Sequence, residues 1–159
     1  MSRLLLCFSV ATLAAGCATQ YSRDGMGFSG GVEAQMITND TARISGRGNG
    51  FTDKARIQDF VLLKAAETAA AHGFSHLAIL GSENVTSVSS YTTPGTMQTS
   101  VYGNSAYTTY NPGYRDTVIK PGADAMVKFC KQDKANPCSD MLPANEIIQN
   151  LGPKYLPKN

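Results

Sequence analysis

The sequence predicts an α+β domain with a mostly antiparallel sheet of four or five strands and one long helix packed on one face. Two observations predict this class. Apolar or small residues alternate with polar ones over residues 32–46, on both sides of Asn39-Asp40, which is typical of an antiparallel hairpin. Residues 53–71 then contain no glycine or proline and are rich in alanine and leucine, which favours a helix.

The predicted helix covers residues from about 53 to 72. Thr52 is a good N-cap, and Gly73 can take the left-handed conformation that ends a helix. One stripe of the helix is rich in alanine, which allows close contact with a sheet: Ala55, Leu62, Ala65, Ala66 and Ala69. Phe60 and Leu63 lie on another face, so we expect later parts of the chain, or else a partner protein, to cover them.

The remaining elements follow the long helix. We expect a short buried strand at 77–80 and a closing pair of strands at 117–120 and 125–130, joined by a Pro-Gly turn. Pro143 favours a short C-terminal helix at 144–151, which the next Gly-Pro pair would end.

The domain is expected at residues 28–152, after a tether at 17–27 and before a tail at 153–159. Residues 91–114 form an insertion of Thr, Ser, Gly, Asn and Pro that is either flexible or an extended hairpin. It holds five of the seven tyrosines: Tyr91, Tyr102, Tyr107, Tyr110 and Tyr114. Because tyrosine is common at recognition surfaces, these residues are a candidate interaction surface, and a solvated loop without a partner is the alternative.

Residues 1–16 have the pattern of a secretory signal peptide. Arg3 supplies a positive charge, an uncharged run extends from Leu4 to Ala15, and small residues precede Cys17. The run is shorter than the roughly 20 apolar residues that a membrane-spanning helix needs. We therefore expect export across a bacterial inner membrane.

The end of this leader, Leu13-Ala14-Ala15-Gly16-Cys17, resembles a bacterial lipobox. The resemblance implies a diacylglyceryl group on the Cys17 sulfur and an acyl chain, commonly palmitate, on its amine. Two or more chains make membrane anchoring stable. Leucine is usual where Ala14 stands, so the alternative is ordinary cleavage, for instance after Ala18, which would give a soluble periplasmic protein. By the same resemblance, Ala18 after the cysteine favours the outer membrane, facing the periplasm.

Cys130 and Cys138 remain once the leader and the lipid site account for the other two cysteines. In an oxidising compartment, such a pair with a short polar loop between indicates a structural disulfide. Free thiols are the alternative. The spacing differs from the Cys-x-x-Cys of redox-active pairs.

Three motifs resemble chemical sites but lack the context that each needs. Gly27 to Gly31 fits the letters of a nucleophile elbow, yet a tether rather than a strand precedes it. Gly46 to Gly50 has neither the third glycine of a dinucleotide loop nor the Lys-Ser/Thr of a phosphate loop. Gly73 separates His72 from His76, so the two do not share a helical face that could bind zinc. We expect no enzymatic activity, metal, cofactor or small-molecule ligand.

Charge gives no reason to expect nucleic-acid binding. The formal net charge is +2, and charged residues are 16% of the chain. The nearest approach to a basic cluster is Lys128, Lys131 and Lys134, but Asp124, Asp133 and Asp140 lie among and around them. This pattern is typical of an ordinary solvated surface.

Five short motifs between residues 29 and 80 carry a family resemblance: Gly30-Gly31, Arg43-Ile44-Ser45, Gly48-Asn49-Gly50-Phe51-Thr52, Leu62-Leu63-Lys64-Ala65-Ala66-Glu67 and His72-Gly73-Phe74. They resemble a family of small uncharacterised lipoproteins of proteobacterial envelopes. The order of helix and strand is also similar, at the level of fold, to stress-sensor lipoproteins of the Rcs type. The resemblance implies an envelope location and an α+β fold, but no activity.

These patterns together predict a non-enzymatic, lipid-anchored envelope protein with an interaction or structural role. It would bind the membrane through the lipid on Cys17, and residues 91–114 are its candidate surface for contact with another envelope protein. One alternative is a stress or ligand sensor that signals through protein contacts. Another is a soluble periplasmic protein whose activity the sequence does not reveal.

Overall fold

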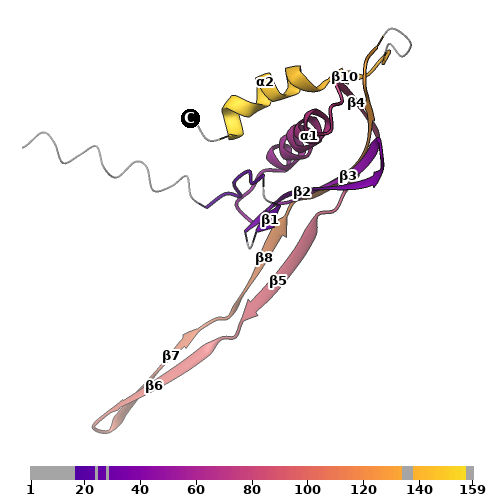
Figure 1. Cartoon of the computed structure of the whole chain (residues 1–159). Coiled ribbons are helices and arrows are strands. Elements are labelled where there is room, and N and C mark those ends of the chain that lie inside the picture. Colours follow the sequence, from indigo (N-terminus) through magenta and orange to yellow (C-terminus); the bar gives the residue numbers. More distant parts are fainter. Residues whose placement is uncertain (1–16, 24, 28, 134–137, 157–159) are drawn as a thin grey trace, which may run out of the picture. The chain divides into compact units, whose positions relative to one another are not determined.

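The computed structural model describes residues 17–23, 25–27, 29–133 and 138–156. It divides the chain into two compact units, one made of the residues up to Ser87 and from Lys120 onward, the other of Val88–Ile119. Figure 1 shows both units and labels most of their elements. The predicted α+β class is confirmed. The predicted leader at 1–16 and the last three residues of the predicted tail lie outside the described residues.

The first unit is built on a six-stranded antiparallel sheet with the strand order β1-β2-β3-β9-β4-β10. Its strands are β1 (Met26–Gly27), β2 (Gly30–Thr38), β3 (Thr41–Arg47), β4 (His76–Asn84), β9 (Gly122–Cys130) and β10 (Leu142–Pro143). The predicted hairpin is β2–β3, in which Val32 pairs with Gly46 and Ala34 with Ile44. Since β1 and β10 have two residues each, four longer strands make up most of the sheet.

Strand β9 lies in the middle of the sheet, between β3 and β4. The predicted pairing of residues 117–120 with 125–130 is therefore wrong. Residues 117–120 belong to β8 (Tyr114–Lys120), which pairs with β5 in a separate two-stranded sheet. The physical reason is burial: alternate residues of β9 are buried, and pairing on both sides puts this strand in the core.

Helix α1 (Lys54–Ala71) packs between the sheet and helix α2, as Figure 1 shows, and confirms the predicted long helix. It begins slightly later than predicted, because Asp53 rather than Thr52 is the N-cap and accepts a hydrogen bond from the Ala55 N–H. The Thr52 hydroxyl is engaged with the N-terminal segment instead. Gly73 ends the helix with a φ of +77°, in the left-handed conformation that the sequence predicts.

Helix α2 (Ala144–Tyr155) supplies the cover that the far side of α1 needs. The Tyr155 ring packs edge-on against Phe60, with 5.0 Å between the ring centroids. Phe60 and Leu63 are both fully buried, as expected. The predicted end of this helix at Gly152-Pro153 is wrong, because the helix continues to Tyr155, whose hydroxyl donates to Asp59 on α1.

The second unit is a long antiparallel hairpin, the second of the two alternatives for the insertion. Its strands are β5 (Ser87–Thr93), β6 (Thr96–Tyr102), β7 (Ser105–Asn111) and β8 (Tyr114–Lys120). β5 pairs with β8 and β6 with β7. Two Pro-Gly pairs interrupt the ladder between them, and the backbones at Gly95 and Gly113 approach too closely for a side chain at Gly113. A two-residue loop, Gly103-Asn104, closes the hairpin.

Candidate membrane attachment site

The chain just after Cys17 is fixed to the first unit by Thr19. This side chain is 1% exposed. Its backbone N–H donates to the Thr52 hydroxyl at 2.9 Å, and its own hydroxyl donates to the Ser29 carbonyl at 2.7 Å. The Thr19 hydroxyl also accepts the Asn49 N–H at 3.0 Å. A buried polar residue with this many partners holds the backbone in one place.

Asn49 links the same segment to the loop before α1. Its side-chain Nδ2 donates to the Cys17 carbonyl at 2.8 Å. Its Oδ1 accepts the Phe51 N–H at 3.0 Å and the Thr52 hydroxyl at 2.7 Å. One amide group thus bonds to both Cys17 and Phe51. The glycine-rich stretch from Gly46 to Gly50 therefore contains a residue that ties the N-terminal segment to the chain just before α1.

Residues 19–23, which we call the N-terminal strap, continue along α1. The Tyr21 ring packs edge-on against Phe60, with 5.3 Å between centroids, and its hydroxyl donates to Glu67 at 2.6 Å. Arg23 Nε donates to the same carboxylate at 2.8 Å, and Lys64 Nζ donates to the Arg23 carbonyl at 2.7 Å. Burial, and then the hydrogen bond to Glu67, raise the pKa of the Tyr21 phenol far above its usual value. Tyr21 therefore stays protonated and keeps donating at any physiological pH.

The link between Cys17 and the folded unit is much shorter than the predicted tether at 17–27. Only Ala18 lies between Cys17 and the buried Thr19. Cys17 itself is exposed and forms no disulfide. Two residues span at most about 7 Å when fully extended. Any group attached to the Cys17 sulfur is thus held next to the surface of the first unit.

The chain matches no family model, no curated protein and no solved structure. The family resemblance given above stays a prediction. Neither helix in the described part of the chain has the length and apolar composition of a transmembrane span.

The structure separates the five candidate tyrosines instead of gathering them on one face. Each is more than half exposed. In the β6–β7 ladder, Tyr110 lies opposite Met97, and Tyr107 lies opposite Ser100. Because successive residues of a strand face opposite sides, Tyr102 and Tyr107 share one face and Tyr110 lies on the other. Tyr91 and Tyr114 belong to the β5–β8 ladder, where the Tyr91 hydroxyl donates to Asp116 at 3.0 Å.

The two histidines have local structural contacts. His72 Nδ1 lies 2.9 Å from the Thr68 carbonyl at the end of α1, which is the contact with the last carbonyls of a helix that its position favours. His76 Nδ1 lies 2.9 Å from the Ser75 hydroxyl. Within the described residues, no three His, Cys, Asp or Glu side chains are grouped so that they could hold a metal ion.

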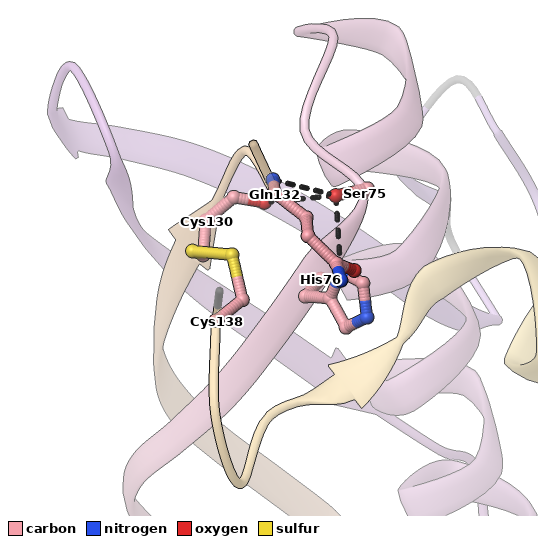
Figure 2. Close-up of a disulfide and its surroundings, with 5 residues drawn as sticks. All are labelled: Ser75, His76, Cys130, Gln132 and Cys138. Carbon is pink, nitrogen blue, oxygen red and sulfur yellow. Dashed lines mark hydrogen bonds between the residues drawn. A yellow bond between two sulfur atoms is a disulfide. The ribbon is translucent and has the colours of Figure 1, made fainter. Parts of the chain in front are cut away.

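A disulfide joins Cys130 at the end of β9 to Cys138, with 6.0 Å between the Cα atoms (Figure 2). Ser75 lies beside it: the Ser75 N–H donates to the Cys130 carbonyl at 3.0 Å, and the Gln132 N–H donates to the Ser75 hydroxyl at 2.9 Å. The bond thus fixes the chain that leaves the sheet. The middle of the closed loop, residues 134–137, lies outside the described residues.

We expect loss of this disulfide to lower the free energy of unfolding by about 2.5 kcal/mol, since the bond closes a short loop in the unfolded chain. The measurement is urea denaturation of the Cys130→Ala/Cys138→Ala variant against the parent, both carrying Cys7→Ser and Cys17→Ser so that no other thiol interferes. The parent should also show no free thiol before reduction. Reactive thiols in the untreated parent would contradict the oxidised state.

Proposed function

We propose that this protein is a non-enzymatic lipoprotein of the bacterial envelope, anchored through Cys17 and acting by contact with another envelope protein. The observation that carries the anchoring is the lipobox-like sequence that ends at Cys17. The exposed Cys17 and the buried Thr19 support it, because they leave the sulfur accessible at the point where the folded unit begins. The residue after Cys17 favours the outer membrane, facing the periplasm.

The Cys17→Ser variant tests the anchor. We expect the parent to fractionate with membranes, and its intact mass to include a diacylglyceryl group and an acyl chain on residues from Cys17 onward. The variant should lose these groups, and its membrane-bound fraction should fall at least about tenfold, because each buried methylene contributes about 0.8 kcal/mol.

The matched control is Cys130→Ala/Cys138→Ala, which also removes sulfur but should keep the lipid. An unmodified parent would rule out the lipid anchor, as would equal membrane binding of the parent and of Cys17→Ser protein whose intact mass shows that residues 1–16 have been removed.

The contact role rests on the hairpin of the second unit. Within residues 87–120, all of them described, each strand has a single neighbour, so every strand has an open edge. Residues 84–114 contain no charged side chain. Met97, Val101 and Tyr102 are each more than two-thirds exposed. Exposed strand edges without charged residues are able to pair with another chain, and exposed tyrosines add contact area.

Deletion of the hairpin tests this role. Residues 88–119 would be replaced by an Asn-Gly turn, which can close the remaining chain ends. Crosslinked protein recovered from whole envelopes should include a partner that the deletion variant loses, while the first unit keeps its circular dichroism spectrum. Matched point variants, Tyr102→Ser/Tyr107→Ser and Tyr110→Ser, remove rings from opposite faces and show which face is used. Identical recovery with and without the hairpin would exclude it as the contact element.

A further inference from the structure

Phe51 is an apolar ring that the first unit does not bury. It is 77% exposed, and its neighbours hold it there. The Phe51 N–H is bound to the Asn49 side chain, and the Thr52 N–H donates to the Asn49 carbonyl at 3.1 Å. The loop is thus fixed on both sides of the ring. An exposed phenylalanine in a fixed loop forgoes the stabilisation that burial of its side chain would give.

Phe51 lies close to Cys17, the proposed site of lipid attachment. A single amide group, the side chain of Asn49, accepts from the Phe51 N–H and donates to the Cys17 carbonyl. The ring and the cysteine are therefore two parts of one hydrogen-bonded loop. Thr52, the residue after Phe51, also bonds to the Thr19 N–H.

We propose that Phe51 enters the interfacial region of the lipid bilayer beside Cys17, so that the first unit lies on the membrane in one orientation. This rests on the proposed lipid anchor. With acyl chains in the bilayer, the single residue Ala18 keeps Thr19 within about 7 Å of Cys17. Asn49 holds the loop to both residues, since its Nδ2 donates to the Cys17 carbonyl at 2.8 Å and its N–H to the Thr19 hydroxyl at 3.0 Å. Apolar side chains at the surface of interfacial proteins are buried about 5–10 Å into the headgroup and acyl boundary. Phe51 is therefore close enough to reach this region.

The chain contains no tryptophan, which makes the position of this residue directly measurable. Lipidated protein carrying Phe51→Trp would be reconstituted in vesicles of phosphatidylethanolamine and phosphatidylglycerol, with and without brominated acyl chains. We expect a blue-shifted emission and loss of most of its intensity in the brominated vesicles.

The matched control is Ile37→Trp. Ile37 is also an exposed apolar residue of the first unit, 47% exposed, and lies near the turn between β2 and β3. β3 separates this turn from the Asn49 loop by about 20 Å, so emission from this tryptophan should not change in brominated vesicles. A third variant inserts six Gly/Ser residues between Ala18 and Thr19 in the Phe51→Trp protein. It should still sediment with vesicles but lose the quenching.

Each outcome decides between the two proposals. If intact mass shows no acylation and the protein does not sediment with vesicles, both the anchor and the Phe51 contact fail. If the protein is acylated and sediments, but Phe51→Trp is quenched no more than Ile37→Trp, the anchor stands and the Phe51 contact is wrong. If quenching survives the spacer undiminished, the short link does not place the ring, which overturns the inferred orientation.

Discussion

Replacement of Phe60 by alanine is expected to lower the free energy of unfolding of the first unit by about 3–5 kcal/mol. The side chain is fully buried. Its ring is packed edge-on between Tyr21 of the N-terminal strap and Tyr155 of α2, with centroid distances of 5.3 and 5.0 Å. The Arg56 guanidinium lies 5.5 Å from the same ring centroid. Truncation therefore removes apolar area and the common contact of three segments.

Phe51→Ala is the matched control, because it deletes the same group from an exposed position and should change the stability of the unlipidated protein by less than about 0.5 kcal/mol. Both variants would be measured by urea denaturation in the Cys17→Ser background, followed by circular dichroism. Phe60→Leu keeps most of the volume and should cost less than Phe60→Ala. If Phe60→Ala were no more destabilised than Phe51→Ala, the packing of the strap and α2 on α1 would be wrong.

The long helix shows what periodicity does and does not reveal. Its existence and its C-terminal end were predictable, since residues 53–71 lack glycine and proline and Gly73 follows them, whereas the N-cap is Asp53 and not the predicted Thr52. The buried face was predicted only in part: Ala65, Ala66 and Ala69 are buried, but Ala55 is exposed and Leu62 half-buried. Ile57, Val61 and Phe60 are buried as well. A helix packed between a sheet and a second helix has two buried sides. Its own sequence does not show which apolar residues face the sheet and which face the second helix.

The N-terminal strap could not be predicted from local pattern. Residues 18–27 are polar and contain glycine, which is typical of a tether. The bonds that fix Thr19 come from Asn49 and Thr52, about 30 residues away, and such pairings leave no mark on a single sequence. Tyr21 was the one available signal, because an aromatic ring in a free tether has nothing to pack against.

The hairpin did carry signals. The Pro-Gly pairs at 94–95 and 112–113 stand at corresponding places on its two arms, and Gly103-Asn104 between them is a typical two-residue turn. Together they define two ladders of equal strand length. The strands were nevertheless hard to predict because the segment has few aliphatic residues. A two-stranded ribbon exposes both faces, so its sequence needs no alternation of apolar and polar residues.

Gly30→Ala is expected to destabilise the first unit by about 3 kcal/mol or more. Gly30 has a φ of +101°, which disfavours any residue with a Cβ. A Cβ built there would overlap the Arg47 carbonyl, the backbone of the neighbouring strand β3, and would press on the Thr19 methyl group at 3.2 Å. Backbone strain and steric overlap therefore both destabilise the variant. The contact with the Thr19 methyl group also disturbs the residue that holds the N-terminal strap in place.

The Gly73→Ala variant separates the effect of backbone strain from the effect of steric overlap. Gly73 also has a positive φ, +77°, but a Cβ there meets no atom within 4 Å, so only backbone strain of about 1 kcal/mol is expected. Thermal and urea unfolding would give the two losses. Trypsin cleavage after Arg23 would report release of the strap, which should be faster in Gly30→Ala and unchanged in Gly73→Ala. Equal stability and equal cleavage of the two variants would show that the strap does not pack against the start of β2, and would remove the geometric basis for holding Cys17 close to the folded unit.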